Sequence, residues 1–389
     1  MTHPIVDALR GTEAQFTELR REFHRHPEIG FEEQKTSDRV AALLRLWGYE
    51  VHRGLAKTGV VGTLKVGNGS KRLGLRADMD ALPMQENSGK AWSSTVEGKF
   101  HGCGHDGHTA TLLYAAEYLA RTRNFSGTLH LIFQPAEELL YGGRVMVEEG
   151  LFEQFPCDHI FGLHNMPSQP LGKIGLRDGA MMASSDTVHI EVNGVGGHGA
   201  VPEHTVDATL VACHITLALQ SIVSRNITPF QPVVVTVGSI QAGHAPNIIN
   251  DKVLMKLTVR TLDEAVRQTV LQRIHDIAVA QAESFNATAT IRHVNGSPVL
   301  SNNAQANEMV RTVATDLFGQ DAVASVNAFM GSEDFAFMLE KNPHGCYFTL
   351  GAGDEPDRCM VHNPGYDFND KLLLTGAALW TALTEHYLR

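Results

Sequence analysis

The sequence has few cysteines, and their spacing argues against a disulfide framework. Its 389 residues include five, an odd number, at the scattered positions Cys103, Cys157, Cys213, Cys346 and Cys359. Disulfide-rich secreted domains instead carry even, closely spaced sets. Residues 1–16 also lack the basic and then apolar pattern of a secretory signal. A cytoplasmic protein with reduced thiols is therefore expected.

Long apolar runs and basic runs are missing as well. No apolar segment approaches the roughly 18 residues that a membrane-spanning helix needs, so no membrane partner is expected. The formal net charge of -11 argues against DNA or RNA as a partner. The chain is 43% hydrophobic and 19% charged, which is typical of a folded protein. Its length exceeds one ordinary core and predicts two domains.

Outside residues 185–297, strand-like segments alternate with helix-like ones. Such alternation predicts an α/β fold, here a larger domain with a mixed sheet covered by helices. In these sheets the chemistry gathers on loops at the carboxyl ends of the strands. The clearest segments are helix-like at 12–26, 34–48 and 106–122 and strand-like at 60–66, 72–83, 127–134 and 158–164.

The pattern changes within residues 185–297. Half-exposed strand patterns and two long helix patterns follow one another in the order β-α-β-β-α-β. That order is the ferredoxin-like split motif. The sequence therefore predicts a smaller satellite domain over 185–297, inserted into a larger discontinuous domain made of 1–184 and 298–389.

The stretch HGCGHDGH, residues 101–108, crowds metal-binding side chains into a glycine-rich loop. Cys103 and His105 are two residues apart, so on extended backbone both side chains leave the same side. Thiolate and imidazole are good ligands for zinc and similar divalent metals, and glycines let a loop approach an ion closely. The alternative is a glycine-rich turn whose histidines cap the following helix.

Two adjacent glutamates, Glu137 and Glu138, follow a strand-like segment through Pro135. Because adjacent side chains point in different directions, one carboxylate can bind an ion while the other contacts water. This division suits a metal-assisted hydrolase, in which a carboxylate accepts a proton from activated water. The alternative is a solvated acidic helix start that complements the helix dipole.

Single polar residues end other strand-like segments. His164 in GLHNMP and His362 in MVHNPGYDF stand in turn-like contexts, where a purely structural histidine is the alternative. Asp78 and Asp80 in RADMDALP lie on one side of a strand end, where two surface charges are the alternative. Together these residues supply enough donors for one or two ions and a spare carboxylate.

The order of these motifs resembles a known family. FHRHPEIGFEE, LRADMDALP, HGCGHDGHTA, FQPAEE, GLHNMP, GGHGAVP, GSEDF and VHNPGYDF follow one another as in the M20-type metallopeptidase superfamily. Over nearly the whole chain, the sequence is similar to its amidohydrolase subfamily, which includes hippurate hydrolase and N-acyl-amino-acid amidohydrolases. The resemblance implies a catalytic domain split around a ferredoxin-like satellite domain. It also implies two divalent ions per subunit and hydrolysis of an amide that carries a free α-carboxylate.

The resemblance assigns roles to catalytic-domain residues. Glu137 would be the general base, and the metal ligands would be Cys103, His105, Glu138, His164 and His362. The superfamily motif His-x-Asp is replaced here by Asp78 and Asp80. Asp80 is then expected to support the site next to the ligands, and the role of Asp78 stays open. Because a thiolate can bridge two ions, Cys103 is the expected bridge and is expected to be sensitive to oxidants.

In the satellite domain, the resemblance implies that His198 helps to stabilise the tetrahedral oxyanion. Asn247 and Arg260 would contact the substrate carboxylate or the oxyanion. A guanidinium suits a planar carboxylate through two parallel hydrogen bonds. An ion pair within the domain is the alternative for Arg260.

Two departures from the family pattern lie where specificity is expected to be set. Glu203 and then His204 follow the proline of GAVP, where the family has histidine directly. Asn250 replaces the proline of the family's NVIP motif. The resemblance therefore predicts the reaction of this protein more safely than its preferred substrate.

The motif GSEDF also matches the family, at Glu333 and Asp334. Contact of Glu333 with the metal site is one interpretation. Helix capping by Ser332 and Asp334 is the alternative.

The function predicted on these grounds is metal-dependent hydrolysis of N-acyl amino acids such as hippurate, by a cytoplasmic homodimer. Zinc or manganese is the expected metal, and nickel or cobalt could replace it in vitro. One alternative is a dipeptidase or carboxypeptidase that uses the same ions. Another is a catalytically silent metal-binding homologue, which should have lost the base or a ligand. A structural zinc site would instead saturate a single ion in a closed tetrahedron.

Overall fold

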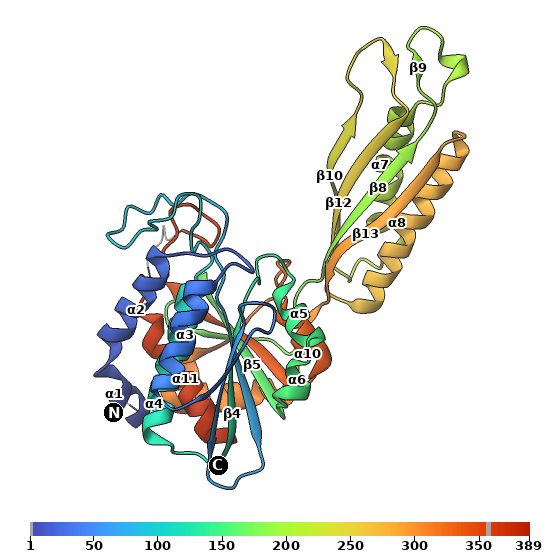
Figure 1. Cartoon of the computed structure of the whole chain (residues 1–389). Coiled ribbons are helices and arrows are strands. Elements are labelled where there is room, and N and C mark those ends of the chain that lie inside the picture. Colours follow the sequence, from blue (N-terminus) through green and yellow to red (C-terminus); the bar gives the residue numbers. More distant parts are fainter. Residues whose placement is uncertain (1–2, 355–358) are drawn as a thin grey trace. The chain divides into compact units, whose positions relative to one another are not determined.

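The computed structural model describes residues 3–354 and 359–389, which form two compact units (Figure 1). Unit 1 comprises residues 1–179, 301–327 and 334–389, and unit 2 comprises residues 180–300 and 328–333. The sequence analysis set the boundaries at 185 and 298 and assigned 328–333 to the catalytic domain. The structure instead groups 328–333 with unit 2, where Phe329 pairs with Met182, and the predicted domain boundaries stay a prediction.

Unit 1 is built on an eight-stranded mixed sheet with the strand order β1-β2-β4-β3-β5-β16-β6-β15. Its central strands β4, β3, β5 and β16 are parallel, while β1 and β2 continue the sheet in antiparallel pairing. The strands are β1 (Glu50–Arg53), β2 (Val60–Val66), β3 (Arg72–Asp78), β4 (Gly127–Gln134), β5 (His159–Pro170), β6 (Ile174–Leu176), β15 (Val323–Ser325) and β16 (Gly345–Gly353). The mixed-sheet α/β fold predicted from the sequence is confirmed.

Helices cover the sheet of unit 1. They are α1 (Pro4–Arg10), α2 (Glu13–Arg25), α3 (Gln34–Leu46), α4 (His105–Thr122), α5 (Gly142–Glu148), α6 (Leu151–Gln154), α9 (Ala304–Phe318), α10 (Phe335–Lys341) and α11 (Leu372–Tyr387), with the 3-10 turn η3 (Gln320–Ala322). Every residue of α4 from 105 to 116 is buried, because α2, α3 and α11 pack on one side of it and the sheet lies on the other. The segment that begins with His105 is therefore held rigidly.

Unit 2 has the βαββαβ order expected for the satellite segment. Its antiparallel sheet has the strand order β10-β12-β8-β13, and α7 and α8 pack against it. These elements are β8 (Ser185–Asn193), α7 (Ala208–Ser221), β10 (Val233–Ala242), β12 (Lys252–Thr261), α8 (Glu264–Ser284) and β13 (Thr288–Ser297). Alternate residues of β12 are buried, as expected for a sheet with one covered face.

Short elements complete the chain. They are β7 (Gly179–Met182), β9 (Gly197–His198), β11 (Ile248–Ile249), β14 (Leu300–Asn302), the 3-10 turn η1 (Pro202–His204) and the π-helical turn η2 (Ile222–Asn226). Strands β9 and β11 pair with each other and so join two loops of unit 2.

One helix among the described residues, Ala208–Asn226, is long and apolar enough to cross a membrane by length and composition alone. The sequence analysis expected none. Its mean hydropathy is 1.2 over 18 residues, of which 33% are buried. A core helix of a soluble domain passes the same test, and Val211, Ile215 and Leu219 indeed belong to the core of unit 2.

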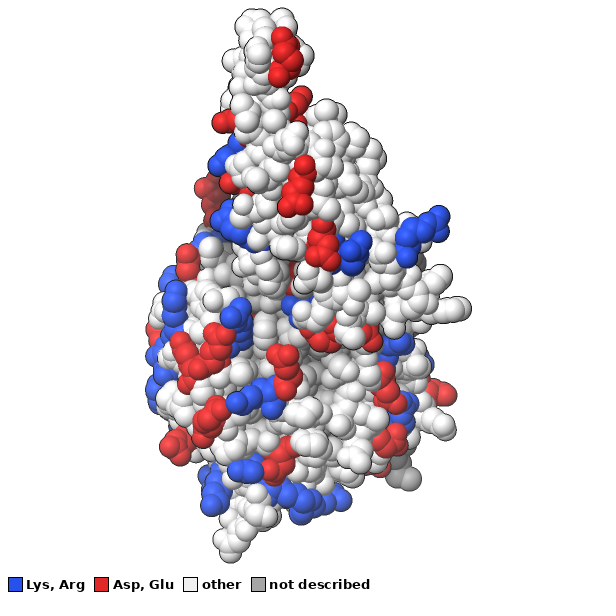
Figure 2. Space-filling model, turned by 90° about the vertical axis from the view of Figure 1, so that its right-hand side faces the viewer, with Lys and Arg blue, Asp and Glu red and all other residues white. Residues whose placement is uncertain are grey.

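Figure 2 shows one face of the molecule, where charges of both signs lie mainly on the lower part and the upper part carries few. On the face drawn in Figure 2, basic and acidic side chains alternate, and no continuous basic area is visible on that face.

We predict that Gly376→Ala lowers the free energy of unfolding of the chain by about 1–3 kcal/mol, because overpacking forces neighbours to move. A Cβ atom at Gly376 on α11 would overlap the methyl group of Thr111 on α4. The measurement is urea unfolding of the metal-loaded protein. Adding Thr111→Ser removes that methyl group and should recover most of the loss, and a double variant as unstable as the single one would contradict this packing account.

Candidate metal centre

The candidate centre lies where the parallel strands of unit 1 end. Asp78 is the last residue of β3, Glu137 and Glu138 follow β4, and His164 lies on β5. Because β3, β4 and β5 run in the same direction, these positions meet at one edge of the sheet. The buried helix α4 begins there with His105.

The five sequence-predicted ligands come together in overlapping groups. Cys103, His105 and His164 form one group and Cys103, Glu138 and His362 another, with the donor atoms of each group within 4.8 Å of one another. The Cys103 Sγ atom lies 3.3 Å from His164 Nε2, and His362 Nε2 lies 3.3 Å from Glu138 Oε1. Cys103 belongs to both groups, as the predicted bridging role requires.

Buried atoms without hydrogen-bond partners test whether these residues fit a cation. Among the described residues, His105 Nε2 and Glu138 Oε1 are both buried and make no hydrogen bond of good geometry, although His362 Nε2 lies 3.3 Å from Glu138 Oε1. Such atoms are costly unless something binds them. They lie 4.0 Å apart, so one cation between them would satisfy both. The donor set therefore fits divalent metal ions.

Burial keeps the imidazole of His164 in the neutral form that a metal ligand needs. Burial, together with the nearby His108, lowers the pKa of His164 to about 3. The ring is therefore neutral near pH 7. Its Nδ1 atom bonds the backbone oxygen of Asn165 at 2.7 Å, which leaves Nε2 free to face Cys103.

Cys103 and His105 hold protons that a cation would displace. Burial raises the pKa of the Cys103 thiol well above its usual range, and the charges of Glu138 and Glu137 raise it further. Burial opposes the charged form of His105, but Asp78 and Asp80 outweigh it and raise the pKa of that imidazole to about 10. Metal binding requires the deprotonated ligands, so ions and protons compete here.

Asp80 supports two of the predicted ligands. Its Oδ1 atom lies 3.2 Å from His105 Nδ1, and its Oδ2 atom accepts the backbone N–H of Glu138 at 2.9 Å. A proton on Nδ1 leaves the lone pair of His105 Nε2 directed at the cluster. Asp80 therefore contacts both of these predicted ligands, and its supporting role stays a prediction.

Asp78 contacts the side chains of Arg76 and His108. Its Oδ2 atom accepts a hydrogen bond from Arg76 Nη1 at 2.7 Å, and its Oδ1 atom lies 2.6 Å from His108 Nδ1. All three side chains are buried. Both carboxylate oxygens are engaged, yet Asp78 also forms a group of possible metal donors with His105 and His108, whose donor atoms lie within 4.8 Å of one another, so its role stays open.

Sequence reasoning missed several residues that hold the ligands. His108 Nε2 lies 2.6 Å from Asn165 Oδ1, and the amide nitrogen of Asn165 donates to the Tyr366 hydroxyl at 2.7 Å. His24 Nδ1 lies 2.7 Å from Asp106, next to His105. His108, Asn165 and His24 all stand inside the quoted motifs, and their presence there was the only signal for them.

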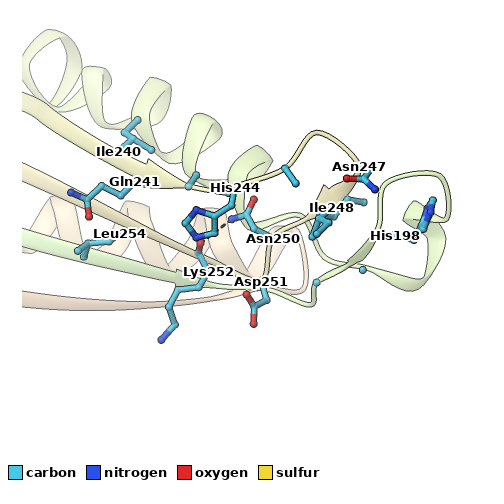
Figure 3. A pocket seen from close by; sticks show the side chains of 16 residues that line it. His198, Ile240, Gln241, His244, Asn247, Ile248, Asn250, Asp251, Lys252 and Leu254 are labelled. Atoms are coloured by element: carbon cyan, nitrogen blue, oxygen red, sulfur yellow. Dashed lines mark hydrogen bonds between the residues drawn. The ribbon is translucent and has the colours of Figure 1, made fainter.

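In unit 2, His198 and Asn247 line one open groove of about 1190 Å³ (Figure 3). The pairing of β9 with β11 brings them together, because Ile248 pairs with His198. Both side chains are exposed. The two residues that the resemblance assigns to the substrate thus share a surface, and Arg260 does not line it.

Arg260 lies on β12 and is half-buried, and it donates a hydrogen bond to the Ser332 hydroxyl. No ion pair joins Arg260 to a carboxylate among the residues that the structure describes, so the alternative of an internal ion pair is not seen. Ser332 lies in the returning segment 328–333 of unit 2, as does the buried Glu333.

The remaining sequence-flagged residues have local roles. Asp334 precedes α10, but its side chain makes no cap hydrogen bond and instead accepts from Arg76 and from the backbone N–H of Gly143. Asn250 accepts from Thr209 at the start of α7 and donates to the backbone oxygen of Lys252. Glu203 and His204 are exposed in η1.

The mixed sheet presents thiol, imidazole and carboxylate donors near the ends of its strands, and a second glutamate lies beside them. This arrangement is typical of metal-binding hydrolases. The chain belongs to Peptidase family M20/M25/M40, whose model matches residues 74–386. Within that family it is an amidohydrolase. The resemblance predicted from the motifs is thereby confirmed.

Relatives span the chain from end to end. It is 44% identical over 386 residues to the hippurate hydrolase of Campylobacter jejuni, covering 99% of this chain and 100% of that protein. It is 37% identical to IAA-amino acid hydrolase ILR1-like 2 of Arabidopsis thaliana, covering 95% and 84%. It is 36% identical to thermostable carboxypeptidase 1 of Saccharolobus solfataricus, covering 97% and 96%.

Solved structures of similar proteins have the same fold as this chain. A putative aminohydrolase from methicillin resistant Staphylococcus aureus matches with a TM-score of 0.94 and 31% identity over 100% of both chains. The Bacillus subtilis YXEP protein, described as a dinuclear metal binding peptidase of the M20 family, matches with a TM-score of 0.85 and 30% identity over 97% and 99%.

We predict that Cys103→Ser weakens zinc binding by at least about tenfold and manganese binding by less, because zinc prefers thiolate more strongly than manganese does. The measurement is metal content after dialysis against a competing chelator. Cys157→Ser is the control, since the Cys157 thiol donates to the Phe155 backbone oxygen, outside the cluster. Unchanged zinc retention by Cys103→Ser would remove Cys103 from the ligand set.

Proposed function

We propose that this amidohydrolase cleaves the amide bond of N-acyl amino acids, with hippurate as the model substrate, to give a carboxylic acid and a free amino acid. One observation carries the proposal: Glu137 lies inside the donor cluster, beside Glu138. Its Oε2 atom is 3.9 Å from His105 Nε2. The similarity to a hippurate hydrolase supports this substrate class.

We assign the metal ligands Cys103, His105, Glu138, His164 and His362 to two divalent ions, zinc or manganese. Bound there, the ions would polarise the amide carbonyl and acidify water. The similarity to a dinuclear peptidase supports the number of two.

Glu137 is the general base in this proposal. Its carboxylate takes a proton from the attacking water and gives it to the departing amine nitrogen. Glu137 is 6% exposed, which limits competing solvent around that proton. Asp80 keeps His105 oriented throughout, since its hydrogen bond fixes the ring.

In the same proposal, groups of unit 2 bind the substrate. His198 stabilises the oxyanion, and Asn247 and Arg260 hold the carboxylate or the oxyanion. Support comes from the shared groove of His198 and Asn247 and from the absence of a competing carboxylate partner at Arg260 among the described residues. Unit 1 would then be the catalytic domain and unit 2 the satellite domain.

A dipeptidase or carboxypeptidase is the second candidate function. The 36% identity to a thermostable carboxypeptidase favours it, and the same base and ions would serve. A silent homologue is disfavoured, because the base and all five ligands are present.

The first test is amino-acid release from a panel of N-benzoyl, N-acetyl and N-indoleacetyl amino acids and dipeptides. Wild type and Glu137→Gln are stripped of metal and reconstituted with zinc or manganese. We expect wild type to cleave the acyl amino acids, and the variant to keep its metal but lose about 10²–10⁴-fold in kcat. A variant with wild-type kcat would refute Glu137 as the base, and a wild type active only on dipeptides would favour the second candidate.

We also propose that the enzyme is a cytoplasmic homodimer. Five free cysteines suit a reducing compartment. Strand β10 is an edge of its sheet, and it contacts α7, whose Leu217 and Leu210 are 73% and 48% exposed. Two β10 edges paired about a two-fold axis would cover both features.

Light scattering should therefore give twice the chain mass of 42.5 kDa. Leu217→Glu should shift the protein towards monomer, because it places a charge in the apolar contact. Leu46→Glu is the control, since Leu46 is 78% exposed on α3 of unit 1. A wild-type protein that is monomeric at micromolar concentration would rule the dimer out.

A further inference from the structure

The segment Phe23–Glu33, the first of the quoted motifs, has no role in the proposed chemistry, yet it runs along the loops of the metal centre. The backbone oxygen of Glu28 accepts the N–H of Ala81, and Ile29 pairs with Ala81 in an isolated bridge. A Cβ atom at Gly30 would lie 3.0 Å from both Cα and Cβ of Ala136. The segment is thus packed against the residue that precedes Glu137.

Glu33 ends this segment and is fully buried, with 0% of its surface exposed. One carboxylate oxygen, Oε1, accepts the backbone N–H of Ala136 at 2.9 Å. The other, Oε2, accepts the hydroxyl of Thr58 at 2.7 Å. Both oxygens therefore have fixed partners, and one of those partners is the loop of the base.

The backbone at Ala136 needs such a partner. Its φ angle is +53°, in the left-handed region that is unfavourable for a residue with a Cβ atom. Conformations of this kind cost about 1–3 kcal/mol and persist only where the surroundings enforce them. The hydrogen bond from Ala136 to Glu33 and the close approach of Gly30 supply that enforcement from two sides.

A second buried carboxylate holds the other side of Glu137. Asp80 Oδ2 accepts the backbone N–H of Glu138 at 2.9 Å. The backbone N–H groups of Ala136 and Glu138, the residues on either side of Glu137, are thus each bound by a carboxylate from a different segment. The turn is closed by a 2.7 Å hydrogen bond from Leu140 N to Glu137 O.

We infer that Glu33 is a positioning residue for catalysis: it holds Ala136 in the left-handed conformation that directs the Glu137 carboxylate into the cluster. This inference rests on the proposed role of Glu137 as the base. Misplacing a reacting group by about 1 Å can cost about 10²-fold in rate. Glu33 therefore acts through Ala136 and touches neither substrate nor ions.

Glu33 holds Ala136 by accepting a hydrogen bond, and its negative charge is not needed for this. Burial and the neighbouring charge of Asp80 raise the pKa of Glu33 to about 7, so the ionised form is disfavoured. A glutamine could accept from Ala136 with its oxygen and donate to Thr58 with its nitrogen. The neutral variant should therefore keep the turn intact.

The test compares Glu33→Ala and Glu33→Gln in the full-length, metal-reconstituted enzyme on its best panel substrate. We expect Glu33→Ala to lose about 10–100-fold in kcat, with KM within about threefold of wild type and metal content unchanged. Glu33→Gln should keep kcat within about threefold. Wild-type kcat in Glu33→Ala, or a loss explained by missing metal, would overturn the inference.

Two further variants separate positioning from folding. Gly30→Ala pushes on Ala136 without removing Glu33, so it should also lower kcat, and wild-type kcat in that variant would count against the inference even if Glu33→Ala failed to fold. Glu28→Ala is the matched control, because the Glu28 carboxylate binds Thr36 at the start of α3 and not the loop of Ala136. It should lower the melting temperature but leave kcat unchanged.

Glu137→Gln, measured in parallel, separates the role of Glu137 as the base from the role of Glu33 in positioning it. If it is inactive while Glu33→Ala is fully active, the base stands and the positioning role falls. If Glu137→Gln keeps wild-type kcat, the proposed function of Glu137 itself falls, and with it the reason for positioning that residue.

Discussion

The buried ion pair between Arg76 and Asp78 is the contact on which the order of unit 1 at the metal centre depends. Arg76 lies on β3, and its guanidinium bonds Gln134 at the end of β4 and Asp334 at the start of α10. Asp78 in turn holds His108 on α4. Two adjacent strands and two helices are therefore tied at one point. Breaking a buried pair of this kind is far more costly than the pair is stabilising, because an uncompensated charge remains.

Much of the fold was readable from the sequence, for physical reasons. The central strands are buried on both faces and appear as apolar runs, and the run of β3 stops at Asp78, where the strand ends; the run of β5 stops at His164, although that strand continues to Pro170. The βαββαβ order of unit 2 was readable because its strands are covered on one face and alternate in polarity. The return of residues 328–333 to unit 2 was not readable, because it depends on pairing with Met182 and carries no local pattern.

The donor residues of the candidate site were predictable from the sequence, but the hydrogen bonds that connect them to their supporting residues were not. Asp78 and Asp80 look alike in the sequence, and only their contacts separate them: one faces Arg76 and His108, the other His105 and the Glu138 amide. Asp334 resembled a helix cap because a helix follows it, yet its carboxylate faces the sheet. Glu33 was quoted within a motif, but its partner Ala136 lies 103 positions away, and a left-handed alanine has no signature in sequence.

The protons on Cys103 and His105 have a consequence for metal occupancy. The raised pKa values of both groups favour their protonated forms near neutral pH, and as metal ligands both would have to lose a proton. Loading is therefore an exchange reaction, in which cations enter and protons leave to solvent. Its equilibrium shifts by about tenfold per pH unit for every proton released. Acidification would therefore favour release of the ions, because it returns protons to Cys103 and His105.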